Sequence, residues 1–298
     1  MDFLKLPTPL EEIEVHPGNN DGIKLFIKRD DLIHAEISGN KWRKLKHNIE
    51  KAVQEKATSL ISAGGAWSNH LAALAAAGKL LRFETVGIIR GEEPPVWSDT
   101  LVYCKSQGMR LIFISRREFD KLPGSITQYM LEQQGGYYIP VGAENERGVK
   151  GCEEIITELD ITPDYFCLPV GTGTTMKGVG RKLNSSKLVG FSALKESSQH
   201  STEFLKWVED NTNTQIKYEY SLGGFAKSSA QLENFIVDFF KNTKTMLEPV
   251  YTGKMMLGVF DMLEKKQFIP GSSIVCLHTG GLQGLKGYPD LHSRLFTS

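Results

Sequence analysis

Short runs of apolar residues alternate along this chain with longer segments in which apolar residues recur every three or four positions. A short apolar run bounded by turn residues predicts a strand buried on both faces, and the longer spacing predicts a helix. Strands that alternate with helices in this way predict an α/β fold with parallel sheets covered on both faces. The predicted strands lie at residues 23–28, 59–62, 85–90, 110–114, 137–140, 164–170, 188–192 and 273–278.

The order of these elements predicts two α/β domains of unequal size. Residues 1–45 and 146–298 would form the larger domain, and residues 46–145 the smaller. An extended, proline-stiffened segment opens the chain, and the first predicted strand has the pattern of half a hairpin. Ligands of such folds bind beyond the carboxyl ends of the strands, where the glycine turns lie. Helices are predicted at residues 41–55, 68–80, 98–106, 124–134 and 148–159, and after residue 175.

The composition narrows the class of partner. The 298 residues carry 35 basic and 35 acidic side chains, which argues against nucleic acid or an anionic membrane as the partner. The amino terminus lacks the apolar run of a signal peptide, and no stretch is apolar enough to span a bilayer. The four cysteines are widely spaced without a CxxC pair, which favours neither a metal site nor disulfides and fits a reducing compartment. We expect a cytoplasmic protein that binds a small molecule.

Lys41 stands in an unusual position. Ser38, Gly39 and Asn40 predict a turn that ends in a helix N-cap, which puts Lys41 in the first helical turn. The helix dipole disfavours a cation there and lowers its pKa, and such a lysine is the nucleophilic amine that forms a Schiff base with an aldehyde. Taken alone, this segment is better explained by an ordinary surface lysine, because the same helix carries several other basic residues.

Residues 171–175 form a turn rich in glycine and threonine between a predicted strand and a helix. Gly171 and Gly173 let the backbone approach a ligand closely, and N–H groups at a helix N-terminus bind anions. The hydroxyls of Thr172, Thr174 and Thr175 add donors. The spacing differs from dinucleotide and nucleoside-triphosphate motifs, so a small phosphate monoester fits best. A tight turn that needs glycine only for its geometry is the alternative.

A second glycine turn precedes Trp67, Ser68, Asn69 and His70 at the start of a predicted helix. The N–H groups and the Ser68 hydroxyl suit a carboxylate, and Asn69 suits an aromatic ring or its substituents. His70 is a candidate acid or base because the ordinary pKa of histidine lies near neutrality. An N-cap serine with two polar neighbours explains the same pattern equally well.

Two later turns carry further polar side chains. Tyr251 and Thr252 lie at a proline-containing turn before a helix, where a tyrosine is usually a packing residue. His278 and Thr279 lie at the carboxyl end of a buried strand, where α/β sites form. With the earlier turns, these residues supply an amine, a phosphate site and a carboxylate site. That set is what an enzyme using pyridoxal phosphate on an amino acid requires.

The order of these motifs resembles the 1-aminocyclopropane-1-carboxylate (ACC) deaminase and D-cysteine desulfhydrase family of pyridoxal-phosphate enzymes. The resemblance implies the tryptophan-synthase-β-like fold of fold type II enzymes, with two open parallel-sheet α/β domains, the cofactor in a cleft between them, and a homodimer. It runs nearly from end to end and rests on Pro7-Thr8-Pro9-Leu10, Ile27-Lys28-Arg29-Asp30-Asp31-Leu32, Ser38-Gly39-Asn40-Lys41, Ser68-Asn69-His70, Gly171-Thr172-Gly173-Thr174, Pro249-Val250-Tyr251-Thr252-Gly253-Lys254 and His278-Thr279-Gly280-Gly281.

The resemblance also implies roles for single residues. Lys41 would hold the cofactor and move protons at the α carbon of the substrate, and Asn69 would contact the 3-hydroxyl of the cofactor ring. Residues 171–175 would bind the phosphate, and Thr279 would face the pyridine nitrogen. Ser68 would bind the substrate carboxylate or assist proton transfer. The other expected substrate-facing residues are Trp67, Asn69, His70, Tyr251, Thr252 and His278, with Tyr251 as an acid, a base or a nucleophile.

Two threonines favour the desulfhydrase branch of that family. The deaminases resemble Tyr-Glu-Gly-Lys and His-Leu-Gly-Gly, whereas this chain has Thr252 and Thr279 at those places. A carboxylate stabilises a protonated pyridine, which withdraws electrons more strongly than the neutral ring that a hydroxyl favours. We expect elimination from D-cysteine or a relative, giving pyruvate, sulfide and ammonia. ACC deamination, racemisation and a non-catalytic binding protein are the alternatives.

The chain departs from both branches near the expected substrate. Trp67 stands where glutamine is common, and Ala72 where arginine is frequent. Residues 281–284 replace the usual Gly-Gly-x-Pro-Ala. These changes concern the substrate and not the cofactor.

Overall fold

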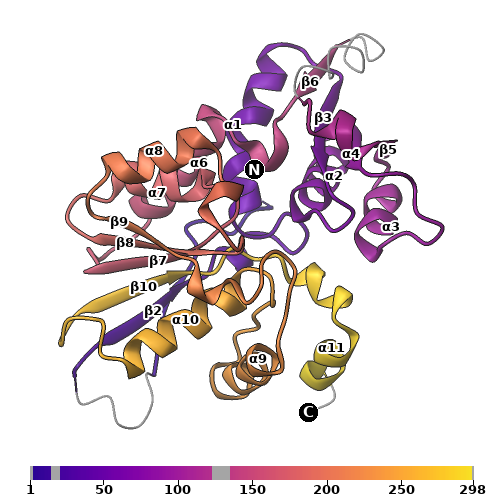
Figure 1. The fold of residues 1–298 in the computed structure, drawn as a ribbon. Helices are drawn as coiled ribbons and strands as arrows, with labels where there is room; N and C mark the ends of the chain where they lie inside the picture. The colour runs from indigo at the N-terminus through magenta and orange to yellow at the C-terminus, as the bar shows by residue number, and fades with distance from the viewer. Residues whose placement is uncertain (1–2, 15–20, 123–134, 297–298) are drawn as a thin grey trace. The chain divides into compact units, whose positions relative to one another are not determined.

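The computed structural model describes residues 3–14, 21–122 and 135–296 (Figure 1). The chain divides into two compact units. Unit 1 consists of Met1–His34, Ser38–Asn40 and Cys152–Ser298, and unit 2 of Ala35–Ile37 and Lys41–Gly151. Unit 2 therefore takes in residues 35–37, 41–45 and 146–151, which were predicted from the sequence to belong to the larger domain.

Unit 1 is built on a six-stranded sheet with the order β1-β2-β10-β7-β8-β9. β1 and β2 pair antiparallel, which confirms the hairpin, and the other neighbours in the sheet are parallel. β2 and β10 come from opposite ends of the chain. The strands are β1 (Leu10–Ile13), β2 (Lys24–Lys28), β7 (Tyr165–Val170), β8 (Lys187–Ser192), β9 (Thr214–Lys217) and β10 (Ser273–Leu277).

Alternate residues of these strands enter two cores, one on each face of the sheet. Cys167 and Cys276 pack with residues of α9, α10 and α11, and their neighbours Phe166 and Val275 pack with residues of α7 and α8. Figure 1 shows α7 and α8 on one side of this sheet and α9 and α10 on the other. The helices are α7 (Thr174–Lys182), α8 (Thr202–Asp210), α9 (Ala230–Thr243), α10 (Thr252–Glu264) and α11 (Pro289–Phe296).

Unit 2 has a four-stranded parallel sheet with the order β5-β4-β3-β6. Its alanine-rich helix α2 is buried from His70 to Gly78 and lies against β3, β4 and α3. The elements are β3 (Ser59–Gly64), β4 (Glu84–Arg90), β5 (Arg110–Ile114), β6 (Gly136–Tyr138), α1 (Asn40–Gln54), α2 (Asn69–Leu81), α3 (Asp99–Ser106) and α4 (Arg116–Phe119). α6 (Glu146–Thr157) continues from unit 2 into unit 1.

The predicted α/β class with parallel sheets is confirmed, and each predicted strand is present within two residues of its expected ends. The helix expected at residues 124–134 lies outside the described residues. Five described elements, α4, α8, β9, α9 and α11, were not predicted from the sequence. Among the helices that the structure describes, none has the length and apolar character needed to cross a bilayer.

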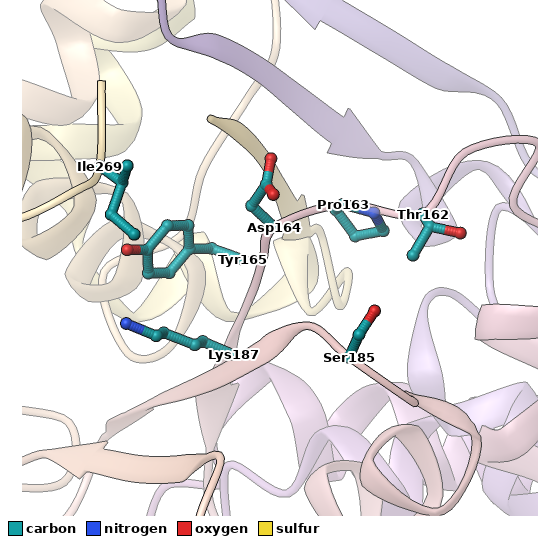
Figure 2. A pocket seen from close by; sticks show the side chains of 7 residues that line it. All are labelled: Thr162, Pro163, Asp164, Tyr165, Ser185, Lys187 and Ile269. Carbon is teal, nitrogen blue, oxygen red and sulfur yellow. The ribbon is translucent and has the colours of Figure 1, made fainter. Parts of the chain in front are cut away.

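A hollow lies at the amino-terminal ends of β7 and β8 (Figure 2). Lys187 Nζ lies 5.5 Å from the centre of the Tyr165 ring, and Asp164 accepts hydrogen bonds from the backbone and the hydroxyl of Ser273. The charged groups of this hollow therefore have partners within the protein. The glycine turns lie at the opposite, carboxyl ends of the strands. The lining residues are Thr162, Pro163, Asp164, Tyr165, Ser185, Lys187 and Ile269.

Candidate active site

Residues 171–175 connect β7 to α7 at the carboxyl edge of the larger sheet. Gly173 has a φ of 89° as the N-cap of α7, and a side chain at this position would collide with the ring of Phe204. Glycine is therefore required both by the backbone conformation and by the close approach. The hydroxyls of Thr172 and Thr174 lie 3.0 Å apart. Together with the N–H groups that open α7, they form a set of donors suited to an anion.

Lys41 is tied to this turn through the residue before it. Asn40 is buried, and its Nδ2 donates to Thr175 Oγ1 over 2.9 Å. Asn40 is the first residue of α1, so Lys41 lies in the first helical turn as the sequence predicts. A single peptide bond thus separates the lysine from a residue anchored on the glycine–threonine turn.

Gly39 holds the start of α1 against the end of β10. It has a φ of 67°, and its N–H donates to the carbonyl of Asp30 over 2.9 Å. A side chain on Gly39 would overlap the carbonyl of Thr279, and one on Gly280 would overlap the hydroxyl of Ser38. The turn before Lys41 therefore packs directly on the turn that contains Thr279.

Tyr251 is the N-cap residue of α10 and reaches the same glycine turn. A Cβ on Gly171 would lie 3.3 Å from the Tyr251 hydroxyl, so the two groups are close neighbours. The Tyr251 ring also meets the ring of Phe225, with 5.9 Å between their centres. Burial raises the pKa of Tyr251, and the negative charge of Glu248 raises it further. This phenol stays protonated at neutral pH, which favours a proton donor over a nucleophile.

Glu248 organises the first turn of α10. Its carboxylate is 1% exposed and accepts the N–H groups of Val250, Tyr251 and Thr252 over 2.8, 2.9 and 2.7 Å. Burial raises the pKa of Glu248, while these hydrogen bonds lower it. The hydroxyl of Thr252 lies 3.2 Å from the same carboxylate. The side chains of Glu248 and Thr252 thus both make their hydrogen bonds at the start of α10.

In unit 2, Trp67, Ser68 and Asn69 follow β3 at its carboxyl end. Ser68 is the N-cap of α2, and its hydroxyl accepts from the N–H of Leu71 over 3.2 Å. Trp67 is 45% exposed, and Ser68 and Asn69 are partly exposed. All three side chains are therefore accessible to a small ligand.

His70 is buried in α2 and 4% exposed, with Nε2 3.0 Å from the hydroxyl of Ser62. Burial lowers the pKa of His70 to about 3, and the positive charges of Lys44 and Lys41 add to this effect. The ring is neutral at physiological pH, which argues against the acid–base role expected from the sequence. The same electrostatic effect shows that Lys41 and Lys44 lie near this part of unit 2.

His278 and Thr252 are also committed to internal contacts. His278 is 1% exposed, its Nε2 lies 2.7 Å from the carbonyl of Met246, and its Nδ1 accepts from the N–H of Gly280 over 3.2 Å. With both ring nitrogens bonded, His278 shapes the turn that carries Thr279. The structure therefore argues against direct substrate contacts by His278 or Thr252.

Two residues of this region were missed by the sequence analysis. Glu248 precedes a proline at a helix start, where a carboxylate acceptor is a weak capping signal. His200 follows a polar segment and belongs to no motif. Only the tertiary structure brings it to Phe204, the ring that lies against Gly173.

Comparison with known proteins gives matches along nearly the whole chain. The family model described as pyridoxal-phosphate dependent enzyme matches residues 2–280. A mitochondrial protein of Arabidopsis thaliana named bifunctional D-cysteine desulfhydrase/1-aminocyclopropane-1-carboxylate deaminase is 30% identical, over 94% of this chain and 77% of that protein. A putative 1-aminocyclopropane-1-carboxylate deaminase of Pyrococcus abyssi is 27% identical, over 90% of this chain and 87% of that protein.

Solved structures share the fold. The crystal structure of an ACC deaminase homologue superimposes with a TM-score of 0.82 at 24% identity, over 98% of this chain and 95% of that chain. A fungal L-serine ammonia-lyase from Rhizomucor miehei gives a TM-score of 0.68 at 17% identity, over 96% of this chain and 98% of that chain. The fold type II class expected from the sequence is thereby confirmed.

Proposed function

Because the chain belongs to the pyridoxal-phosphate dependent enzyme family, we propose that it is a lyase that uses this cofactor on a small amino acid. D-Cysteine is the favoured substrate; one water is consumed, and pyruvate, hydrogen sulfide and ammonia are released. The hydrogen bond from Asn40 to Thr175 carries the proposal. It ties the helix turn that bears Lys41 to an anion-binding turn, and this cofactor needs an amine and a phosphate site held together.

The glycine–threonine turn of unit 1 fits the phosphate of the cofactor. A side chain at Gly171 would crowd Tyr251, and one at Gly173 would strike Phe204, so the turn keeps its form only with glycine at these two positions. The N–H groups at the start of α7 and the hydroxyls of Thr172 and Thr174 supply donors without a competing carboxylate in the first turn of the helix. In this proposal residues 171–175 would hold the phosphate, and Thr279 would hydrogen-bond the pyridine nitrogen.

Side chains at the starts of helices are proposed for proton transfer, for contact with the cofactor ring and for substrate binding. When bound, pyridoxal phosphate withdraws electrons from the α carbon and makes its proton acidic. Lys41 would hold the cofactor through its aldehyde and would accept this proton. Asn69 would contact the ring substituents, and Ser68 would receive the substrate carboxylate. Tyr251, held as a phenol by burial and by Glu248, donates a proton to the leaving sulfur.

The choice of D-cysteine rests on Thr252 and Thr279. Neither residue offers a carboxylate to the pyridine nitrogen, and the nearby carboxylate of Glu248 is occupied by backbone N–H groups. A neutral ring is sufficient for elimination of a good leaving group such as sulfide. The Arabidopsis relative is named for both D-cysteine desulfhydration and ACC deamination, so ACC is the second candidate substrate.

Product analysis with D-cysteine, L-cysteine and ACC tests the proposal. We expect sulfide and pyruvate from D-cysteine alone. Ammonia and 2-oxobutyrate from ACC would show that the two threonines do not select the reaction.

Lys41→Ala should abolish turnover, whereas Lys46→Ala, a control on the same helix, should leave it unchanged. Full turnover by the Lys41 variant would overturn the assignment.

A non-catalytic binding protein for the cofactor or an amino acid is the alternative from another class. It would bind pyridoxal phosphate but release no product from any of the three substrates.

The proposal also includes a homodimer and a cytoplasmic location. Light scattering of the purified protein and fractionation of cells test these two points.

A further inference from the structure

A loop with a strained backbone packs on Tyr251. It follows the short helix η4 (Glu219–Ser221), and its Phe225 is 51% exposed, with 5.9 Å between the centres of the Phe225 and Tyr251 rings. Four residues of the loop have left-handed φ values, namely Leu222 (51°), Gly223 (91°), Gly224 (112°) and Ala226 (56°). Leucine and alanine seldom adopt this conformation, so contacts with the rest of the protein are needed to hold the loop.

A buried ammonium group supplies such contacts. Lys254 lies in the first turn of α10 and is 1% exposed. Its Nζ donates to the carbonyls of Ser221 and Gly224 over 2.6 and 2.7 Å. Each carbonyl also closes a backbone turn, because Ser221 accepts from the N–H of Gly224 and Gly224 accepts from that of Lys227. Lys254 therefore joins two consecutive turns at their first residues, directly before Phe225.

The ammonium group is the stronger of two attachments of this loop. Burial lowers the pKa of Lys254 to about 8, and the negative charge of Glu248 opposes this effect, so the amine is mostly protonated at neutral pH. Hydrogen bonds from a charged donor are stronger than those between neutral groups. The second attachment is neutral and follows Phe225: the Tyr288 hydroxyl donates to the carbonyl of Ala226 over 2.9 Å.

The start of α10 thus carries both the phenol and the cation that holds the loop packed on that phenol. We propose that Lys254 is a positioning residue for Tyr251: its ammonium group fixes the two turns that hold Phe225 against the phenol ring, and the phenol hydroxyl is thereby kept beside Gly171. This inference rests on the proposed function, because it takes Tyr251 to be the acid that protonates the leaving sulfur.

Two substrates with different leaving groups test the inference. The sulfur of D-cysteine leaves with a proton, whereas chloride leaves β-chloro-D-alanine without one, so only the first reaction needs the phenol. Lys254→Met keeps the length of the side chain but has no donor. We expect kcat for D-cysteine to fall about tenfold while KM changes by less than about twofold, because a displaced acid slows proton transfer without weakening binding.

The rate with β-chloro-D-alanine should stay unchanged in Lys254→Met. Lys265→Met, which replaces an exposed lysine at the other end of α10, is the control and should alter neither reaction. Equal losses with both substrates, or no loss with either, would make the role of Lys254 structural and overturn the inference.

A variant of the loop itself tests whether Lys254 acts through Phe225. This residue is half exposed, so Phe225→Ala keeps the fold even if Lys254→Met does not. Phe225→Ala should show the same selective loss with D-cysteine. The double variant should lose no more than either single variant, because both changes remove the same support. Additive losses would mean that the two residues act independently and would overturn the inference.

Cleavage by chymotrypsin tests the hold on the loop without any turnover. The protease cuts after Phe225 only when the loop opens locally. We expect this cut to be about tenfold faster in Lys254→Met, while the cut after Phe296, an exposed residue of α11, keeps its rate. An unchanged rate after Phe225 would overturn the inference even in an active enzyme. Failure of the unaltered protein to convert either substrate would instead overturn the proposed function.

Discussion

At the residue scale, His70 shows how burial changes a side chain that the sequence offers as a catalyst. Its pKa is lowered to about 3 in the folded protein, from 6.5 in a model peptide. Between these pH values the unfolded chain binds the extra proton and the native protein does not. The free energy of unfolding therefore falls as the pH drops below 6.5, by up to about 1.4 kcal/mol per pH unit.

Replacing His70 with Gln should remove this acid sensitivity, because Gln keeps a polar end for Ser62 and does not titrate. Between pH 7 and pH 5 we expect the unaltered protein to lose about 2 kcal/mol more stability than His70→Gln, measured by urea unfolding. His292→Gln, on the surface side of α11, should behave like the unaltered protein. An equal loss in all three proteins would contradict the assignment of a buried, neutral His70.

Gly39 gives a second residue-scale prediction, because it combines a left-handed backbone with a close contact. Gly39→Ala would press the new methyl group onto the Thr279 carbonyl and displace the start of α1. We expect at least a tenfold loss of activity and a lower unfolding temperature. Gly271→Ala is the matched control, since its φ is 79° but a Cβ there meets nothing within 4 Å. That control should cost only about 1 kcal/mol and keep full activity.

At the element scale, the start of α10 depends on a single buried carboxylate. Glu248→Gln keeps the size of the side chain but directs an amide N–H group at one of the backbone N–H donors that the carboxylate now accepts. The unpaired donors should cost about 1–3 kcal/mol in urea unfolding. Turnover should fall as well, because Tyr251 begins the same turn. Glu264→Gln, exposed at the other end of α10, should change neither quantity.

The elements differ in how well the sequence predicts them, for a physical reason. A central strand such as β7 is buried on both faces and leaves an uninterrupted apolar run. β9 lies at the edge of its sheet and reads Thr-Gln-Ile-Lys, so no apolar run marks it. The hairpin was predictable from the strand at residues 24–28 alone, because the turn residues Gly18 to Gly22 precede it in the sequence.

The candidate site divides in the same way. The residues of the glycine turns and Lys41 are predictable because each belongs to a motif of residues that are adjacent in the sequence. The positions of His200 and Glu248 depend on contacts that form only in the folded chain. His200 packs against Phe204, whose ring lies at Gly173, and Glu248 acts through backbone groups. The burial of His70 and His278 could not be predicted, because a polar residue at a helix start or at a strand end resembles a ligand contact in sequence.

At the scale of the whole molecule, the sheet of unit 1 joins the two ends of the chain. β10 lies between β2 and β7, with Lys24 paired to Ser273 and Ile274 paired to Tyr165. The sheet therefore cannot close until the last part of the chain is present, and contacts of such large sequence separation form slowly.

Two shortened chains test this dependence. A chain that ends at residue 270 lacks β10, which leaves the facing edges of β2 and β7 unpaired and removes Thr279 from the site. It should show no cooperative unfolding of unit 1 and no binding of pyridoxal phosphate. A chain that ends at residue 288 lacks only α11 and the burial of Leu291 and Leu295. That loss should cost about 3–6 kcal/mol but preserve the sheet and cofactor binding. If the shorter chain unfolded cooperatively and bound the cofactor, β10 would not be required to complete the site.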